Sequence, residues 1–182
     1  MADIYLIRHG EAAASWEQDR DPGLSEQGVV QANSLASDFT DIPIERIFSS
    51  PLQRAQQTAI PLGHSKALDV QLCESMREIP TPVNIPVSER ISWLRSIALQ
   101  PWFEAPAVVT DWRQGILETL AQLPKGSAVF THFMVMNAVL GHIQGHRNLV
   151  CYQPDYCSVL SLNLGSSLEV VSIGNQSSTR VL

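Results

Sequence analysis

The sequence predicts an α/β fold in which a mostly parallel central sheet carries helices on both faces, making a three-layer αβα sandwich. Two observations support this prediction. Short apolar runs alternate along the chain with longer segments whose apolar residues recur at helical spacing. The first run, residues 4–7, is wholly apolar, as is typical of a strand buried on both faces of a parallel sheet. No repeat or long linker divides the 182 residues, so we expect one domain over residues 1–182.

The first half of the chain predicts three strands and two helices. The strands are residues 4–7, 46–49 and 70–72. Ser25 is a favourable N-cap for a helix that continues to about residue 39. Ser50 followed by Pro51 has the cap and first-turn pattern of a second helix, which continues to about residue 62.

The second half begins with a loop at residues 79–86, which carries three prolines and no periodic pattern. Ser88 can cap a helix to about residue 99, and an amphipathic pattern predicts another helix over residues 109–123. A further helix is expected at residues 134–142. The remaining strands are residues 127–131, 156–162 and 168–173.

The charge balance excludes two classes of partner. A net charge of −6 does not provide the basic face that binds nucleic acid or an anionic membrane, so we expect neither partner. Of the 12 basic residues, however, ten are Arg and only two are Lys. Arginine is the side chain best suited to planar, bidentate recognition of oxyanions.

The cysteines and the start of the chain predict a cytoplasmic protein. Three cysteines without a Cys-x-x-Cys pair are typical of small buried side chains in a reducing compartment. Residues 1–8 lack the pattern of a signal peptide, and the most apolar stretch, residues 128–143, is too short for a membrane span. His142 and His146 have the spacing of zinc ligands on a helix, but Gly145 between them predicts a helix end instead.

Polar side chains follow three of the predicted strands at the points where those strands end. Arg8 and His9 end the first strand, Arg54 stands in the first turn after the second, and His132 follows the fourth. In open α/β sheets, ligands bind at the carboxyl ends of the strands, so these side chains can meet there. Two arginines, two histidines and the free N–H groups of a helix start predict a site for an oxyanion such as phosphate.

Gly10 is expected to shape this site through the backbone. Arg8 and His9 are neighbours, and in a straight strand they would point to opposite faces of the sheet. Both can face one pocket only if the chain turns immediately, and glycine permits such a turn.

Several segments, in order along the chain, resemble the signature of the histidine phosphatase superfamily, which has the phosphoglycerate-mutase-like fold. They are Arg-His-Gly-Glu at residues 8–11, D-x-x-L-S-x-x-G-x-x-Q-A at residues 21–32, S-x-L-x-R-A-x-Q-T at residues 50–58, Met-Arg-Glu-Ile at residues 76–79, and Tyr-Cys-Ser-Val at residues 156–159. His132 stands between the last two. The resemblance covers residues 4 to about 162 and implies the same α/β fold with a small lid insertion at about residues 79–125.

The resemblance implies a two-step phosphoryl transfer and gives each of these side chains a role. His9 would attack phosphorus and become phosphohistidine, while Arg8 and Arg54 would bind and neutralise the phosphate oxygens. His132 would complete the phosphate pocket as a catalytic and phosphate-binding residue. Glu78 would protonate the leaving oxygen and then activate water. The arginines would supply the positive charge, so no metal ion or other cofactor is expected.

Departures from the family pattern leave two of these assignments open. The family usually has an Asn about five residues beyond Gly10. Here Ser15 is the nearest polar substitute and becomes a candidate for binding phosphate. The G-x-W-x-G patch that commonly follows the acid is absent, so Glu74 is an alternative to Glu78 as the general acid.

The function predicted from these residues is a metal-independent phosphatase. It would hydrolyse a phosphomonoester or phosphoamidate through a phosphohistidine intermediate on His9. A phosphomutase of the same superfamily is one alternative, and a non-catalytic module that binds phosphorylated ligands is another. The expected partner is a small phosphorylated substrate or a phosphoprotein; the sequence predicts neither the identity of the substrate nor the oligomeric state.

Overall fold

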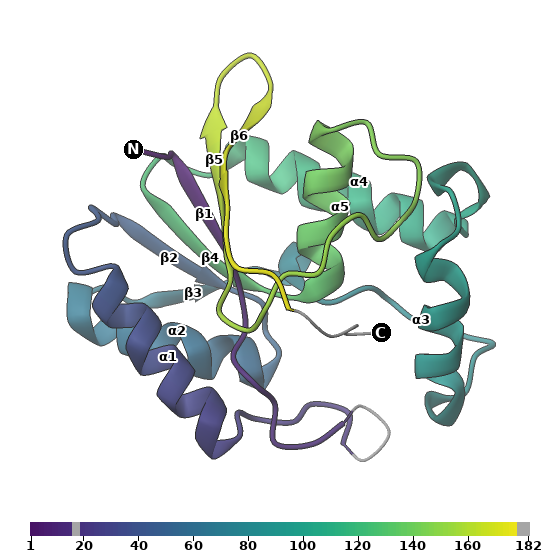
Figure 1. The fold of residues 1–182 in the computed structure, drawn as a ribbon, viewed down its shortest axis with the longest axis horizontal. Coiled ribbons are helices and arrows are strands. Elements are labelled where there is room, and N and C mark those ends of the chain that lie inside the picture. Colours follow the sequence, from purple (N-terminus) through teal and green to yellow (C-terminus); the bar gives the residue numbers. More distant parts are fainter. Residues whose placement is uncertain (16–18, 178–182) are drawn as a thin grey trace.

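The computed structural model describes residues 1–15 and 19–177, and its centre is a mixed six-stranded sheet (Figure 1). The strands are β1 (Ile4–Arg8), β2 (Arg46–Ser49), β3 (Val70–Leu72), β4 (Ser127–Thr131), β5 (Val159–Leu164) and β6 (Leu168–Ile173). Their order across the sheet is β3-β2-β4-β1-β5-β6. The first four strands pair in parallel, whereas β5 runs antiparallel to β1 and β6 antiparallel to β5. The predicted mostly parallel α/β sheet is confirmed.

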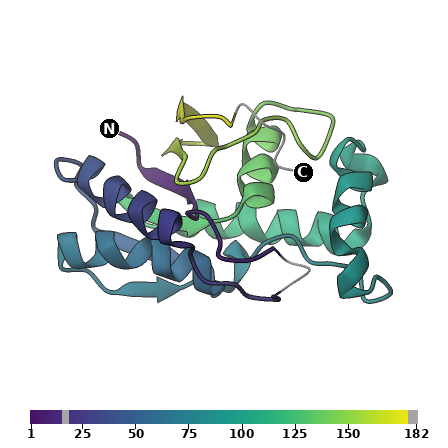
Figure 2. The same cartoon turned by 60° about the horizontal axis from the view of Figure 1, so that its bottom comes forward.

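Helices cover both faces of the sheet (Figures 1 and 2). They are α1 (Glu26–Asp38), α2 (Gln53–Lys66), α3 (Arg90–Ala98), α4 (Ala107–Gln122) and α5 (Phe133–Ile143), with short 3-10 turns η1 (Glu74–Met76), η2 (Val87–Glu89) and η3 (Trp102–Glu104). α1 and α2 pack on one face, and α4 and α5 on the other, which gives the three predicted layers. Among the described residues, no helix is both long enough and apolar enough to span a membrane.

β1 shows why both faces of the sheet need a covering layer. Ile4 and Leu6 belong to the core shared with α4 and α5, whereas Tyr5 and Ile7 belong to the core shared with α1 and α2. All four side chains are buried, as the wholly apolar run predicts. Because β1 lies between β4 and β5, the residue that follows it emerges in the middle of the sheet's edge.

The predicted start of α1 is confirmed, but that of α2 is wrong. Ser25 is the N-cap of α1, and its Oγ accepts a hydrogen bond from Gly28 N at 3.0 Å. The N-cap position of α2 is Leu52 instead of Ser50. The hydroxyl of Ser50 accepts from Leu52 N at 3.3 Å, and the same Oγ lies 2.7 Å from His132 Nε2. Ser50 therefore keeps a local hydrogen bond just before the helix and also contacts a residue distant in sequence, while the helix itself begins at Gln53.

Two other boundaries also differ from the prediction. Ser88 lies inside the turn η2, and the N-cap position of α3 is Glu89, so Ser88 is not the cap of that helix. β5 begins at Val159 and not at residue 156. Cys157 has φ of 57°, a left-handed conformation that does not fit a strand, so the extended pairing starts only after it.

α3 stands apart from the sheet and is held by an apolar cluster of its own (Figures 1 and 2). Leu94 and Ile97 of α3 pack with Ile79, Phe133 and Met134. Phe133 and Met134 open α5, so α3 is anchored to the end of α5 that follows β4. The lid interpretation of residues 79–125 and the single-domain division stay predictions.

Gly10 and Gly28 let the loop after β1 approach α1 closely. A Cβ at Gly28 would overlap Glu11 O, and a Cβ at Gly10 would lie 2.8 Å from Gly28 O. Gly10 does not have a positive φ. The glycine is therefore not needed for a left-handed conformation, and it is required because the neighbouring backbone leaves no space for a side chain.

Replacing Gly28 by alanine is expected to lower the free energy of unfolding by about 1–3 kcal/mol, because the backbone must move to admit the methyl group. Urea denaturation measures this change. Gly115→Ala in α4 is a matched control, since nothing lies within 4 Å of its Cβ position. Removing a glycine from a helix interior is expected to raise stability by about 0.5–1 kcal/mol. Equal effects at the two positions would contradict the steric argument.

Candidate active site

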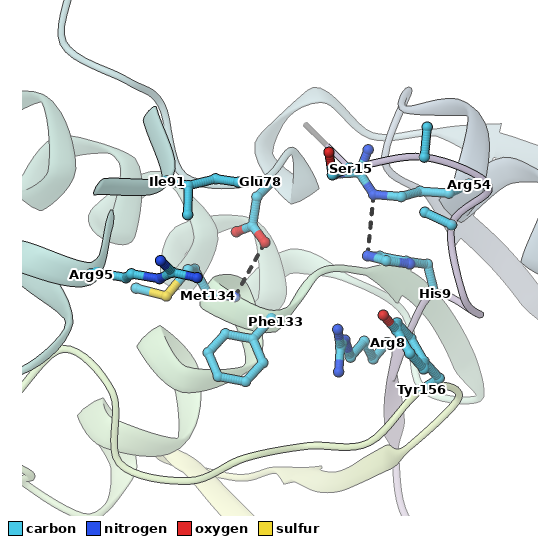
Figure 3. A pocket seen from close by; sticks show the side chains of 12 residues that line it. Arg8, His9, Ser15, Arg54, Glu78, Ile91, Arg95, Phe133, Met134 and Tyr156 are labelled. Carbon is cyan, nitrogen blue, oxygen red and sulfur yellow. Dashed lines mark hydrogen bonds between the residues drawn. The ribbon is translucent and has the colours of Figure 1, made fainter. Parts of the chain in front are cut away.

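His9 follows β1 and is held in one tautomer by contacts at both ring nitrogens. Figure 3 shows the contact with Arg54. Its backbone N–H donates to Thr131 O at 2.9 Å, which continues the pairing of β1 with β4. Nδ1 lies 2.6 Å from Gly10 O, and Arg54 Nε donates to Nε2 at 3.1 Å. A carbonyl oxygen can only accept, so Nδ1 carries the hydrogen and Nε2 keeps its lone pair.

The surroundings of His9 keep its ring neutral. The residue is only 6% exposed. Burial lowers the pKa of His9 well below its usual value, and the positive charges of Arg54 and Arg8 lower it further. A neutral imidazole whose Nε2 is unprotonated is a competent nucleophile once the hydrogen bond from Arg54 is released, so this arrangement can support nucleophilic chemistry at Nε2.

Arg8, the last residue of β1, is fixed on one side of His9. Its Nη1 donates to Pro154 O at 2.8 Å, and its guanidinium carbon lies 4.2 Å from the ring centroid of Tyr156. The ring of Phe133 is also near, at 5.4 Å. Aromatic faces attract a guanidinium and restrict its orientation. The cation is therefore oriented before any anion arrives, which reduces the entropy lost on binding.

Arg54 lies in the first turn of α2 and is only 1% exposed. Thr58 Oγ1 donates to Arg54 O at 2.6 Å and accepts from Gly10 N at 3.0 Å. One hydroxyl thus ties the start of α2 to the loop after His9. The carboxylate of Asp21 approaches Arg54 Nη1 at 4.0 Å. These contacts place the guanidinium of Arg54 directly against the ring of His9.

His132 lies behind His9 instead of at the pocket surface. It is the N-cap residue of α5, directly after β4, and is fully buried. Its ring centroid is 5.2 Å from that of His9. Within the described part of the chain, Nε2 lies 2.7 Å from Ser50 Oγ, and Nδ1 has no hydrogen-bond partner. The structure therefore brings the two predicted histidines together, but His132 is not among the residues that line the pocket.

Acid is expected to destabilise the fold through His132. Burial lowers the pKa of His132 well below its usual value, and Arg54 adds to this shift. The folded protein keeps the ring neutral, whereas the unfolded chain takes up a proton below about pH 6.5. Stability that is present above that pH is therefore lost as the pH falls toward the folded-state pKa. The slope is at most about 1.4 kcal/mol per pH unit for one group.

The variant His132→Gln isolates this contribution, because glutamine does not titrate and can still reach Ser50. Urea denaturation at about pH 7 and about pH 5 is expected to show a smaller loss of stability for the variant than for the wild type. Parallel losses in the two proteins would contradict the buried neutral state of His132.

Glu78, and not the alternative Glu74, is the carboxyl group at the pocket (Figure 3). Glu78 is only 4% exposed; Oε1 accepts from Ile79 N at 2.9 Å, and Oε2 accepts from Met134 N at 3.4 Å. Burial raises the pKa of Glu78, and this effect outweighs the hydrogen bonds and nearby arginines that lower it. The side chain of Glu74 is 75% exposed and pairs with Arg77 at 3.1 Å. A carboxyl group with a raised pKa can hold a proton to donate.

The pocket in front of these groups has a volume of about 240 Å³ (Figure 3). Its charged and polar lining consists of Arg8, His9, Ser15, Arg54, Glu78 and Arg95, and its apolar and aromatic lining of Ala12, Ala14, Ile91, Phe133, Met134 and Tyr156. Ser15 is thus at the pocket, as its place after Arg-His-Gly predicts. Five of the six predicted site residues line one cavity, and the sixth, His132, lies directly behind it.

Sequence reasoning missed three lining residues and one supporting hydroxyl. Tyr156 was recognised as part of a strand motif but was given no role, and its stacking on Arg8 depends on a loop that arrives from the far end of the chain. Arg95 and Ile91 stand four residues apart on α3, a spacing that places both on one helix face and could have identified them. Thr58 gives no sequence signal of its bond to Gly10.

The two histidines near the end of α5 are not arranged as zinc ligands on one helix. α5 ends at Ile143, and Gly145 has φ of 64°, so His142 and His146 do not share a helix. The predicted helix end is confirmed. Among residues 1–15 and 19–177, no group of three or more His, Cys, Asp or Glu side chains is placed to hold a metal ion.

A protein-family model matches the first part of the chain. The family model described as "Histidine phosphatase superfamily (branch 1)" matches residues 4–83. The resemblance to the histidine phosphatase superfamily is confirmed. The matched part includes His9, Arg54 and Glu78, whereas His132 lies beyond it.

Curated relatives extend the similarity along the chain. A Cronobacter sakazakii protein named "Probable phosphoglycerate mutase GpmB" is 27% identical over 165 residues, which cover 80% of this chain and 76% of the relative. A protein of the same name from Yersinia pestis (strain Pestoides F) is 27% identical over 163 residues with the same coverage.

Solved structures share the fold. A phosphoserine phosphatase from Entamoeba histolytica, in complex with 3-phosphoglyceric acid, has a TM-score of 0.72 and 20% identity, and the match covers 97% of this chain and 98% of that one. A mycobacterial glucosyl-3-phosphoglycerate phosphatase in complex with VO3 has a TM-score of 0.72 and 19% identity, and the match covers 97% and 100% of the two chains. The similar proteins therefore include some named as phosphatases and some named as mutases.

Proposed function

We propose that this chain is a metal-independent phosphatase that hydrolyses a phosphomonoester or phosphoamidate through a phosphohistidine on His9. The observation that supports the proposal best is the state of the His9 ring. The ring is buried and neutral, Nδ1 is bonded to Gly10 O, and Nε2 keeps its lone pair between Arg54 and Arg8. This is the form of histidine that a phosphoryl acceptor requires.

In the first step, His9 Nε2 attacks phosphorus and forms a P–N bond while the bond from phosphorus to the leaving group breaks. Arg8 and Arg54 donate hydrogen bonds to the phosphate oxygens, and their positive charges balance the negative charge of the transferring group. Glu78 gives its proton to the leaving oxygen or nitrogen, so the product departs neutral. The buried position of Glu78 favours the protonated form that this step needs.

In the second step, water attacks the phosphorus of phosphohistidine. The carboxylate of Glu78, formed in the first step, takes a proton from this water, and the P–N bond breaks to return neutral His9 and inorganic phosphate. His132 stabilises the arrangement from behind, since its ring stands beside that of His9 and Ser50 fixes its orientation. Ser15 stands at the pocket wall as a further hydrogen-bonding group for phosphate.

A phosphomutase is the second candidate, and the names of the curated relatives favour it. In a mutase, the acceptor in the second step is an alcohol of the product instead of water. Transfer of labelled phosphoryl groups to an added alcohol or phosphorylated acceptor, measured against release of inorganic phosphate, distinguishes the two reactions. Faster transfer than release would favour the mutase.

The decisive experiment traps the intermediate. Wild-type protein reacting with 4-nitrophenyl phosphate is quenched in alkali, where phosphohistidine survives, and in acid, where it is lost. Mass spectrometry is expected to find one phosphoryl group on the peptide that contains His9 after the alkaline quench only. Phosphate on another residue, or steady turnover without any phosphorylated protein, would overturn the proposal.

A further inference from the structure

The pocket in front of His9, which we call the reaction pocket, is lined by two kinds of side chain. One set consists of the groups that the proposed mechanism uses, namely Arg8, His9, Ser15, Arg54 and Glu78. Apart from Arg95, the rest is apolar or aromatic and consists of Ala12, Ala14, Ile91, Phe133, Met134 and Tyr156, which we call the apolar wall. Within the described part of the chain, the hydroxyl of Tyr156 is the only side-chain hydrogen-bonding group of this wall.

The apolar wall is held in place by the core of the protein. Phe133 and Met134 begin α5 and are only 4% and 1% exposed. Together with Leu94 of α3 they belong to one apolar cluster. Ile91 lies one turn before Leu94 on the same helix, so the packing of α3 on α5 also places Ile91 at the pocket. The wall therefore has a fixed shape before a substrate binds.

Glu78 places the apolar wall beside the leaving group. In the proposed mechanism Glu78 protonates the leaving oxygen, so that oxygen comes within hydrogen-bond reach of the carboxyl group. The carboxyl group accepts from Met134 N at 3.4 Å, which puts it directly at the start of α5. Figure 3 shows Ile91 and Met134 on the side of Glu78 that faces away from His9. The organic part of the substrate, which extends beyond the leaving oxygen, therefore meets the apolar wall.

The chemistry of the apolar wall favours some organic groups over others. Hydrocarbon surface that moves from water onto apolar side chains gains free energy from the hydrophobic effect. A hydroxyl group that loses water there without a new partner costs free energy. Arg95 does not remove this cost for a polyol, because a guanidinium cannot accept a hydrogen bond and the residue is exposed to water. The wall therefore disfavours sugar-like groups.

We propose that the apolar wall makes this protein selective for phosphate esters of small, mainly apolar or aromatic alcohols. The inference rests on the proposed function, because it assigns the class of leaving group in that reaction. The limit on size comes from the pocket volume of about 240 Å³, which lies below the range of about 300–1,000 Å³ typical of sites for drug-sized ligands. A single ring or a short chain beside the phosphoryl group fits this limit.

Selectivity is tested with cyclohexyl phosphate and myo-inositol 1-phosphate. The two esters share a six-membered carbon ring and differ only in the hydroxyl groups on its other carbons. We expect kcat/KM to favour cyclohexyl phosphate by about tenfold or more. Neighbouring hydroxyl groups make inositol the better leaving group, so intrinsic reactivity works against this preference. Equal values, or a preference for the inositol ester, would contradict the inference.

The variant Ile91→Gln tests whether the preference comes from the apolar wall. Glutamine brings an amide to a half-buried position of the wall, so the ratio of the two kcat/KM values is expected to fall by about fivefold or more. Ile60→Gln is the matched control, because Ile60 is an exposed residue of α2 that does not line the pocket. Arg95→Gln removes the charge from the same face of α3 and is expected to keep the preference.

Circular dichroism and urea denaturation establish that the three variants are folded. Retention of the full preference in Ile91→Gln, or an equal loss in Ile60→Gln, would separate the preference from the apolar wall and overturn the inference. Loss of the preference in Arg95→Gln would also overturn it, because the selectivity would then belong to the charge on α3.

Binding without turnover tests the apolar wall apart from the reaction. The carbon–phosphorus bonds of cyclohexylphosphonate and methylphosphonate are not cleaved by attack at phosphorus with protonation of an oxygen, and titration calorimetry measures both affinities. We expect cyclohexylphosphonate to bind about tenfold more tightly, with the more negative heat-capacity change that burial of apolar surface produces. Ile91→Gln is expected to reduce this difference. Equal affinities would refute the inference even in an active phosphatase, whereas a failed phosphohistidine trap would refute the proposed function alone.

Discussion

His9→Ala is expected to lower kcat by about 10⁴-fold or more, because the variant lacks the atom that accepts the phosphoryl group. The measurement is the steady-state hydrolysis of 4-nitrophenyl phosphate. In the same variant, the alkaline quench is expected to recover no phosphorylated protein. The pocket retains Arg8, Arg54 and Glu78, so residual turnover would report what charge stabilisation and positioning achieve without a nucleophile.

The control for His9→Ala is His64→Ala. His64 is an exposed histidine in the last turn of α2, so this change removes an imidazole away from the pocket. Circular dichroism and urea denaturation establish that both variants are folded. We expect His64→Ala to retain wild-type turnover. Turnover of His9→Ala within tenfold of the wild type would place the nucleophile elsewhere and exclude the phosphohistidine mechanism on this residue.

Glu78→Gln is expected to lower kcat by about 10²- to 10⁴-fold for an alkyl phosphate, whose leaving oxygen needs a proton. The loss in the first step is expected to be smaller for 4-nitrophenyl phosphate, because nitrophenolate leaves without protonation. A pre-steady-state burst of nitrophenol separates this step from the attack of water. The difference between the two leaving groups identifies a proton donor and cannot arise from a general loss of packing.

The pH profile provides a second signature of Glu78. Burial raises the pKa of this carboxyl, so the proton needed in the first step is retained to a higher pH than in an exposed glutamic acid. Turnover of the alkyl phosphate is expected to fall as the pH rises through the pKa of Glu78, and Glu78→Gln is expected to lack that limb. Glu74→Gln is the comparison: a larger loss there than at Glu78 would assign the acid to Glu74.

The sheet and the convergence of the strand ends could be predicted from local patterns. The apolar run of β1 requires burial on both faces, and parallel pairing of β1, β2 and β4 brings their carboxyl ends to the same edge. This topology explains why His9, Arg54 and His132, far apart in sequence, meet in space. The choice between Glu74 and Glu78 could not be made, because it depends on burial by Met134 and the segment around Ile79.

Two of the differences from the prediction involve contacts between residues distant in sequence. Ser50 has the right chemistry for a helix cap and accepts from Leu52 N at 3.3 Å, but its hydroxyl also lies 2.7 Å from His132 Nε2, a contact that the local sequence does not predict. Gly10 has the conformational freedom of glycine, yet the structure requires only its small size, because Gly28 lies so close. In both cases the residue was identified as important, and the reason for its importance lay in a partner that the local sequence does not reveal.

In the reaction pocket, Arg54 Nε donates a hydrogen bond to His9 Nε2, the nitrogen whose lone pair would attack phosphorus. An electrophile without a stronger hydrogen-bond acceptor than His9 Nε2 leaves the hydrogen bond from Arg54 in place, so the lone pair stays blocked. The oxygens of a phosphoryl group do offer one, so the arrival of the substrate itself draws the arginine away and uncovers the nitrogen. The hydrogen bond from Arg54 thus makes His9 chemically selective. Reagents that modify imidazoles should react slowly with His9, whereas phosphate esters reach Nε2 because their oxygens bind Arg54.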